Sequence, residues 1–234
     1  MAKLWCFGDS YTAGDGCKVF NTGTHVNAIE YRKFLNKKEN EHIKLFSDIV
    51  AEHFNLKCIN LGQSGAGNEK ILDTLLSNIH LISNDDYVIF GVSYFQRFDI
   101  DGLLPSDFST ININSLLDSN DTITDTLLRK SLIEIVINRS SKRFEDRLLR
   151  QVKGLTHILK QLSKNVYVWT NDHYLDEQQT GLFKLADGYH MLSQFLNENC
   201  ITTHTNKVVC DGHLSEIGHK VLANDIIKYF ENAK

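Results

Sequence analysis

The sequence lacks most of the features that mark specialised classes of protein. Its 234 residues contain one proline, Pro105, which marks no domain boundary, and no repeat, linker or low-complexity tract. No apolar run approaches the roughly 20 residues that cross a bilayer. The apolar run before Gly8 is too short for the hydrophobic region of a signal peptide. We therefore expect a cytoplasmic protein with no signal peptide and no membrane span.

The sequence also lacks a strong excess of charge of one sign: it has 25 Lys and Arg and 29 Asp and Glu, which gives a net charge of −4. This small negative net charge disfavours a dedicated nucleic-acid-binding protein. The five cysteines are an odd number without a Cys-x-x-Cys pair, which argues against a disulfide framework or a zinc knuckle. The ten histidines form no His-Glu-x-x-His or His-x-His motif, so nothing supports a metal site.

What the sequence has is an ordinary globular composition, with 42% hydrophobic and 23% charged residues. Short apolar runs alternate with amphipathic segments of helical length. The predicted strands are Lys3–Phe7, Leu56–Asn60, Tyr87–Gly91, Val166–Thr170 and a short fifth at Lys207–Val209. The predicted helices are Ile43–Phe54, Glu69–Ile82, Leu127–Ile137, Phe144–Leu162 and Asn224–Phe230.

Strands separated by helices predict parallel pairing through right-handed crossovers. The expected fold is therefore a three-layer α/β/α sandwich around a mostly parallel, five-stranded sheet. We interpret residues 1–234 as one domain, with a helical insertion and a long crossover at about residues 100–164.

Chemically active residues follow the predicted strands. They are Ser10 after the first strand, a glycine-rich segment from Gly62 to Gly67 after the second, and the pair Asp211 and His213 near the C-terminus. Because ligands bind beyond the carboxyl ends of the strands in open α/β sheets, we expect these groups to meet at one edge. A nucleophile, backbone N–H donors, an acid and an imidazole are the set that acyl transfer to water requires.

Ser10 is the candidate nucleophile, because a turn between a strand and a helix exposes its hydroxyl; its alternative is a helix N-cap. A serine hydroxyl is a weak nucleophile until an imidazole takes its proton. His213 is the candidate base, and Asp211, two residues before it, is placed to accept from the ring N–H. His219 is the competing base, although it is predicted to lie one turn inside the last helix. Asp9 is expected to brace the Ser10 loop.

The ordered motifs resemble those of the SGNH (GDSL-like) hydrolase superfamily. The matching blocks are Phe7-Gly8-Asp9-Ser10-Tyr-Thr-Ala-Gly14 and Asn60-Leu-Gly-Gln-Ser-Gly65. A third block, Asp211-Gly-His213-Leu-Ser, matches in residue type, and the three together span nearly the whole chain. The resemblance implies a flavodoxin-like SGNH hydrolase fold that needs no cofactor. It also implies Ser10 as the nucleophile, His213 as the base, Asp211 as its orienting acid, and the backbone N–H groups of Ser10 and Gly65 as oxyanion donors.

Two positions depart from the family pattern. The family's third block supplies an asparagine that donates to the oxyanion, but here Ser93 stands at that place and Tyr94 follows it. A hydroxyl can donate, and Asn68 is a second candidate for the missing amide; the alternative for Asn68 is a helix N-cap. The last block is Asp-x-His in place of Asp-x-x-His. The missing residue changes the angle at which Asp211 approaches the His213 ring, yet a hydrogen bond between the two is still possible.

Three further residues are candidates for substrate contacts. Tyr94 and Arg97 are predicted to face the pocket, where Arg97 could bind an anionic or sugar group; its alternative is a solvated loop side chain. Trp169 is a candidate platform for a sugar ring, with burial in the core as the favoured alternative.

These observations predict a serine hydrolase that cleaves an ester, with an O-acetyl or other short acyl group on a carbohydrate as the leading substrate class. Its partner is then a small-molecule or glycan ester. The alternatives are a catalytically weak binding or structural protein with the same fold, a lipid esterase or thioesterase, and an acyltransferase that uses the same triad.

Overall fold

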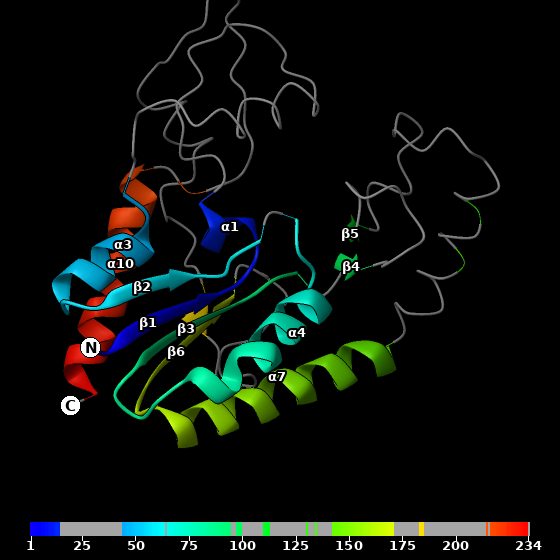
Figure 1. The fold of residues 1–234 in the computed structure, drawn as a ribbon. Coiled ribbons are helices and arrows are strands. Elements are labelled where there is room, and N and C mark those ends of the chain that lie inside the picture. Colours follow the sequence, from blue (N-terminus) through cyan, green and yellow to red (C-terminus); the bar gives the residue numbers. More distant parts are fainter. Residues whose placement is uncertain are drawn as a thin grey trace, which may run out of the picture.

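A parallel sheet forms the centre of the computed structural model (Figure 1). The structure describes residues 1–14, 44–63, 65–94, 97–99, 110–112, 130, 134, 142–170, 183–184, 214 and 216–233. Its strands are β1 (Lys3–Phe7), β2 (Lys57–Asn60), β3 (Tyr87–Val92), β6 (Asn165–Thr170) and β7 (Phe183–Lys184). They pair in the order β2-β1-β3-β6-β7, and every pair in this sheet is parallel.

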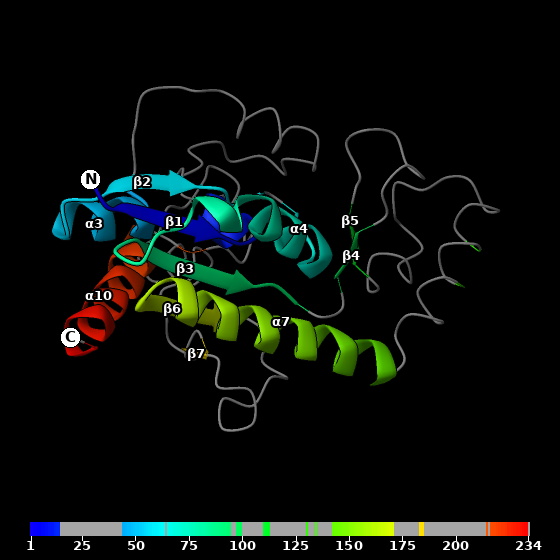
Figure 2. The same cartoon turned by 60° about the horizontal axis from the view of Figure 1, so that its bottom comes forward.

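Helices cover both faces of this sheet (Figure 2). One face carries α3 (Phe46–His53) and α10 (Glu216–Asn232), and the other carries α4 (Asn68–Asn78) and α7 (Lys142–Leu162). A 3₁₀ turn, η1 (Ile79–Leu81), extends α4. The three-layer α/β/α sandwich expected from the sequence is thereby confirmed. Among the helices of the described residues, none combines the length and the apolar content needed to cross a membrane.

The strand β1 illustrates how the sequence pattern produces these layers. Side chains alternate between the two faces of a strand, so neighbouring residues enter different cores. Trp5 and Phe7 pack in the core beneath α4 and α7, whereas Leu4 and Cys6 pack in the core beneath α3 and α10. A strand buried on both faces reads as a continuous apolar run, and such a run is typical of a parallel sheet.

The strand order reverses direction between β1 and β3. The connection after β1 leads through α3 to β2 at the sheet edge, while the connection after β3 leads through α7 to β6 on the other side. The helices of these two connections, α3 and α7, lie on opposite faces of the sheet (Figure 1). In doubly wound folds a crevice opens at such a point, beyond the carboxyl ends of the two strands.

Most predicted elements agree with the observed ones within a few residues. The last helix, predicted at Asn224–Phe230, is longer and spans Glu216–Asn232. The predicted fifth strand, Lys207–Val209, lies outside the described residues, and the fifth strand of the sheet is β7. A two-stranded antiparallel pair, β4 (Arg97–Asp99) with β5 (Thr110–Asn112), was not predicted. Strands of two or three residues are too short to show an alternating pattern. Of the predicted helix Leu127–Ile137, the structure describes only residues 130 and 134, both helical.

Asp86 ties together the amino ends of β1, β3 and β6. Its side chain is 2% exposed and accepts hydrogen bonds from the backbone N–H of Lys3 (2.8 Å), the indole Nε1 of Trp5 (3.0 Å) and the backbone N–H of Ser83 (3.0 Å). The Asp86 carbonyl accepts from Ser163 Oγ at 2.6 Å. Burial alone would raise the pKa of the Asp86 carboxyl, but the hydrogen bonds from Ser83, Trp5 and Lys3 outweigh it and lower that pKa.

We predict that Asp86→Asn lowers the free energy of unfolding by about 1–3 kcal/mol at neutral pH, because an amide nitrogen faces donors that need an acceptor. A lowered pKa in the folded state stabilises the fold above the unfolded pKa, and this contribution disappears as the pH falls through the folded pKa. Urea unfolding between neutral pH and about pH 3 measures both effects. The difference between wild type and Asp86→Asn should shrink in acid.

The neighbouring Asp85 provides the matched control. Its side chain is 80% exposed and lies 3.8 Å from Lys164 Nζ. Asp85→Asn should leave the unfolding free energy nearly unchanged at every pH. An equal effect of the two substitutions would contradict the role assigned to Asp86.

Candidate active site

Ser10 is the first residue of α1 (Ser10–Ala13), a single helical turn that follows β1. Asp9 is the N-cap of this turn, and its Oδ1 accepts from the Tyr11 backbone N–H at 3.1 Å. Gly14 ends the turn with φ 85°, a left-handed conformation that favours glycine, and its N–H donates to the Ser10 carbonyl at 3.0 Å. The N-cap alternative for Ser10 is therefore wrong, because Asp9 holds that position. The expectation that this turn exposes Ser10 is also wrong, because Ser10 is 3% exposed in the structure.

Glycines allow the neighbouring loops to approach α1 closely. A Cβ atom on Gly62 would overlap the backbone nitrogen of Ala13. A Cβ atom on Gly91 would lie 3.0 Å from Trp169 Cζ2 and 3.1 Å from Thr12 Oγ1. The loop after β2 and the end of β3 thus pack against the Ser10 turn at distances that larger residues would not allow.

Asn60 fastens the loop after β2 to the Ser10 turn. Its Nδ2 donates to the Thr12 carbonyl at 2.7 Å, and its Oδ1 accepts from the Gly62 N–H at 2.9 Å. A backbone hydrogen bond from Gln63 N to the Gly8 carbonyl (3.0 Å) adds to this connection. Because all five residues belong to the first two motif blocks, the structure brings those blocks together at the carboxyl edge of the sheet.

Gly65, the predicted second oxyanion donor, lies in this loop with φ 71°. This left-handed backbone explains why a glycine stands there. Ser64, directly before it, lies outside the described residues. The assignment of the Gly65 N–H to an oxyanion hole stays a prediction.

Asn68 and Ser93 have partners that the sequence did not indicate. Asn68 is the first residue of α4, after the N-cap Gly67, so the N-cap alternative for Asn68 is wrong. Its amide pairs with the backbone of Ser93: Ser93 N donates to Asn68 Oδ1 at 2.8 Å, and Asn68 Nδ2 donates to Ser93 O at 2.8 Å. A longer contact joins Asn68 Nδ2 to the Tyr94 carbonyl at 3.4 Å. In this geometry the Asn68 amide is directed to the chain after β3 and not to an oxyanion.

The Ser93 hydroxyl is likewise engaged. It donates to Asp9 Oδ2 at 2.7 Å, and both residues are buried. A hydroxyl has one hydrogen, so in this arrangement Ser93 does not donate to an oxyanion. The expectation that Asp9 braces the Ser10 loop agrees with the hydrogen bonds that its carboxylate accepts from the Tyr11 N–H and from Ser93.

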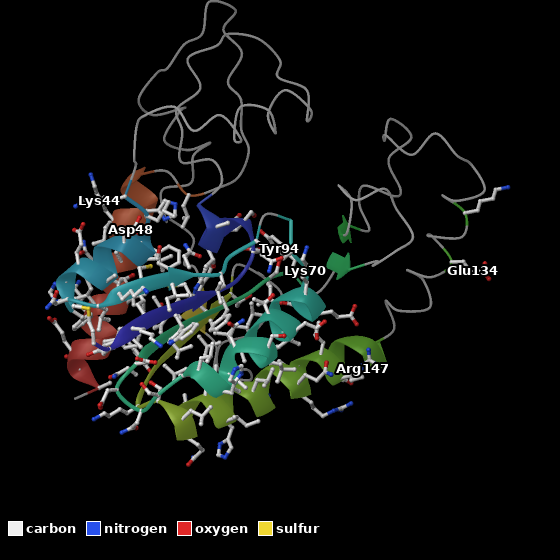
Figure 3. All side chains as sticks on the ribbon, viewed as in Figure 1. Lys44, Asp48, Lys70, Tyr94, Glu134 and Arg147 are labelled. Atoms are coloured by element: carbon white, nitrogen blue, oxygen red, sulfur yellow. The ribbon has the colours of Figure 1, made fainter. Side chains whose placement is uncertain are left out.

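The other predicted site residues are placed differently. Trp169 is 1% exposed and packs edge-on against Tyr11 and Phe46, so its burial in the core is confirmed and the sugar platform is wrong. Tyr94 lies at the carboxyl edge after β3, close to the start of α4 (Figure 3). Arg97 is the first residue of β4, and its side chain lies outside the described part of the structure.

Asp211 and His213 lie outside the described residues. Leu214, which follows His213, is fully buried in the core beneath α3 and α10. Tyr11, which follows Ser10, belongs to the same core cluster. The described neighbours of the candidate nucleophile and of the candidate base thus share one core.

His219, the competing base, is a core residue. It is 0% exposed, its ring stacks on Phe46 at 5.7 Å between centroids, and its Nδ1 accepts from the Phe46 N–H at 3.2 Å. Acceptance at Nδ1 places the proton of the neutral ring on Nε2. These contacts give His219 a structural role at the start of α3.

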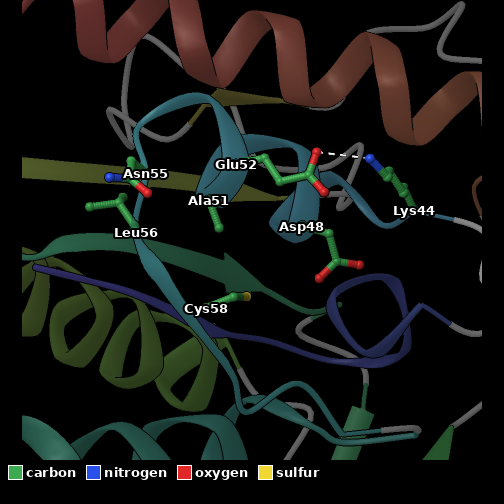
Figure 4. A pocket seen from close by; sticks show the side chains of 7 residues that line it. All are labelled: Lys44, Asp48, Ala51, Glu52, Asn55, Leu56 and Cys58. Carbon is green, nitrogen blue, oxygen red and sulfur yellow. Dashed lines mark hydrogen bonds and ion pairs between the residues drawn. The ribbon is translucent and has the colours of Figure 1, made fainter. Parts of the chain in front are cut away.

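A cavity of about 510 Å³ lies beside β2 and α3 (Figure 4). Its lining consists of Lys44, Asp48, Ala51, Glu52, Asn55, Leu56 and Cys58. Lys44 Nζ and Glu52 Oε2 form an exposed ion pair at 2.8 Å. A hydrogen bond with Cys6 lowers the pKa of the Cys58 thiol, whereas burial raises the pKa of Cys6. Among the residues that the structure describes, Ser10 and Gly65 are not part of this lining.

No family model and no curated protein matches this chain. Among solved structures, it is similar to a carbohydrate esterase (14% identity, TM-score 0.45, covering 98% of this chain and 68% of that one). An acetyl xylan esterase from the rumen bacterium Butyrivibrio proteoclasticus shows 14% identity and a TM-score of 0.45, covering 99% of this chain and 63% of that one. A member of the lipolytic G-D-S-L family from Veillonella parvula shows 14% identity and a TM-score of 0.37, covering 99% of each chain.

This chain spans about two thirds of the length of the two carbohydrate esterases. The assignment of the fold follows from the strand order and the parallel register described above.

We predict that His219→Ala lowers the free energy of unfolding by about 2–4 kcal/mol, because it leaves a cavity and removes the partner of the Phe46 N–H. Urea denaturation followed by circular dichroism measures this loss. His53→Ala is the control, since His53 is an exposed residue that lies 3.0 Å from Glu231. The structural role of His219 would be contradicted by an unfolding free energy equal to that of His53→Ala.

Proposed function

We propose that this protein is a serine esterase in which Ser10 is the nucleophile, His213 the general base and Asp211 the acid that orients it. The observation that carries the proposal is the position of Ser10. It begins a capped helical turn at the carboxyl end of β1, beside the point where the strand order reverses, and two strand-end loops hold this turn. A crevice at that point of an open α/β sheet is the usual place for a ligand.

The proposed reaction has two half-reactions. Ser10 Oγ attacks the ester carbonyl while His213 takes its proton, and the carbonyl oxygen becomes an oxyanion that accepts from the Ser10 and Gly65 N–H groups. Collapse expels the alcohol, which receives the proton from His213, and leaves an acyl group on Ser10. Water, deprotonated by His213, then releases the carboxylic acid and restores the serine.

Ser93 and Asn68 direct their side-chain donors elsewhere, so two backbone N–H groups make up the proposed oxyanion hole. The loss of one oxyanion donor typically costs about 10²–10³ in rate. We therefore propose an esterase with a low turnover rate. The first substrate class to test is an O-acetyl or other short acyl ester of a carbohydrate. The class comes from the motif resemblance, and such an ester needs no apolar channel for a long chain.

The second candidate function is a binding protein that keeps this fold without efficient catalysis. The observation that favours it is the Ser93 hydroxyl, which is held by Asp9 at the place of the family's donating asparagine. Both candidates predict a bound ester or glycan, but only the first predicts a reactive serine.

We predict that a fluorophosphonate probe labels wild-type protein at Ser10, as identified by mass spectrometry of the modified peptide. Ser10→Ala should abolish labelling and the turnover of p-nitrophenyl acetate. His213→Ala should reduce both by about 10³-fold or more, because the proton of Ser10 then lacks an acceptor. Circular dichroism should show that both variants stay folded.

Three outcomes separate the alternatives. A folded wild type that resists the probe would favour the binding protein. Labelling at Ser10 that persists in His213→Ala would contradict the assigned base. Labelling at Ser10 together with turnover of acetylated sugars, and not of long-chain esters, would support the carbohydrate substrate class.

A further inference from the structure

A hydrogen bond between Asp9 and Ser93 crosses the point where the strand order reverses. Asp9 follows β1 and Ser93 follows β3, two strands that pair in parallel with Phe7 opposite Phe90. Ser93 Oγ donates to Asp9 Oδ2 at 2.7 Å, with the two residues 1% and 3% exposed. A hydrogen bond to a carboxylate is stronger than one between neutral groups, and burial strengthens it further.

Ser93 is itself held at both of its backbone polar groups. Asn68 Oδ1 accepts from the Ser93 N–H, and Asn68 Nδ2 donates to the Ser93 carbonyl, both at 2.8 Å. The Asn68 amide thus binds both the N–H and the carbonyl of one residue. Asn68 itself is 2% exposed at the start of α4. Asn68 therefore fixes the backbone of Ser93, and with it the position from which the Ser93 hydroxyl donates to Asp9.

Asp9 passes this constraint to Ser10. One carboxylate oxygen of Asp9 accepts from Ser93, while the other accepts from the Tyr11 N–H inside the helical turn. The Asp9 carbonyl accepts from the N–H groups of Thr12 (3.0 Å) and Ala13 (2.9 Å). Any rotation of Asp9 would disturb the turn that begins at Ser10, since the cap and the turn share these hydrogen bonds.

We propose that Ser93 is a positioning residue for Ser10: its hydroxyl, oriented by Asn68, fixes the Asp9 carboxylate and thereby the turn that carries the nucleophile. This inference rests on the proposed function, because it assigns Ser93 to the reactivity of Ser10. In this proposal Ser93, which stands where the family has an asparagine that donates to the oxyanion, positions the nucleophile instead. Misplacement of a reacting atom by about 1 Å can cost about 10²-fold in rate.

The test compares Ser93→Ala with Ser163→Ala. Both serines are 1% exposed, and each hydroxyl donates to an oxygen acceptor, at 2.7 Å for Ser93 and 2.6 Å for Ser163. Ser93 lies beside the Ser10 turn at the carboxyl ends of the strands, whereas Ser163 precedes β6 at their amino ends and also accepts from the Asn165 N–H at 3.1 Å. Both substitutions remove buried hydrogen bonds and should lower stability, but only Ser93→Ala removes one that reaches the Ser10 turn. Only Ser93→Ala should slow the phosphonylation of Ser10 by the fluorophosphonate probe, by about 10- to 100-fold.

A second pair of variants keeps the test valid if Ser93→Ala does not fold. Asn68→Ala removes the two hydrogen bonds to the Ser93 backbone. Asn78→Ala, on the same helix, removes one hydrogen bond from Nδ2 to the Thr74 carbonyl. Asn68→Ala should slow labelling and Asn78→Ala should not. The double variant Asn68→Ala/Ser93→Ala should label no more slowly than Ser93→Ala alone, because both residues act through one chain of hydrogen bonds.

Turnover of p-nitrophenyl acetate supplies an independent readout. A positioning residue should lower kcat with little change in KM, whereas a purely structural one should lower the folded fraction and leave both constants of the folded enzyme unchanged. Equal labelling rates for Ser93→Ala and Ser163→Ala would overturn the inference while the proposed function stands. A folded wild type that is not labelled at all would overturn both.

Discussion

The pairing of β1 with β2 on one side and with β3 on the other is the constraint on which the rest of the structure depends. Because β1 is buried on both faces, its alternating side chains anchor both helix layers. The parallel register brings the carboxyl ends of the three strands to one edge. Ser10, three residues beyond the last paired residue Phe7, is therefore placed between loops that arrive from distant parts of the chain.

Polar side chains hold this edge together. A buried carboxylate is costly unless it accepts hydrogen bonds, and Asp9 receives them from the Tyr11 N–H and the Ser93 hydroxyl. Asn60 and Asn68 satisfy backbone groups on the loops that flank it. The same hydrogen bonds that offset the burial of Asp9 also determine the direction of the Ser10 turn. Stability and the placement of the candidate nucleophile are thus coupled at this edge.

Much of the fold could be predicted, because its signals are local. The strand Lys3–Phe7 was predicted with its observed limits, and three further strands were predicted within two residues, since each is a short apolar run beside a turn. The strand β7 and the pair β4–β5 could not be predicted, because two or three residues show no periodicity. The burial of Trp169 was the favoured alternative, because it lies in an apolar strand. The buried position of His219 follows from its packing against Phe46 and could not be read from its neighbours in sequence.

By itself the sequence determined the class of fold and the segments that meet at the carboxyl edge, because apolar runs and glycine motifs act over a few residues. Only the tertiary structure decided what Asn68 and Ser93 do there. An amide or hydroxyl donates to whichever acceptor the fold brings within hydrogen-bond distance. Those acceptors are the Ser93 carbonyl, 25 residues from Asn68, and the Asp9 carboxylate, 84 residues from Ser93. Separations of this length leave no trace in a local pattern, so the direction of each donor emerges only when the strands pair.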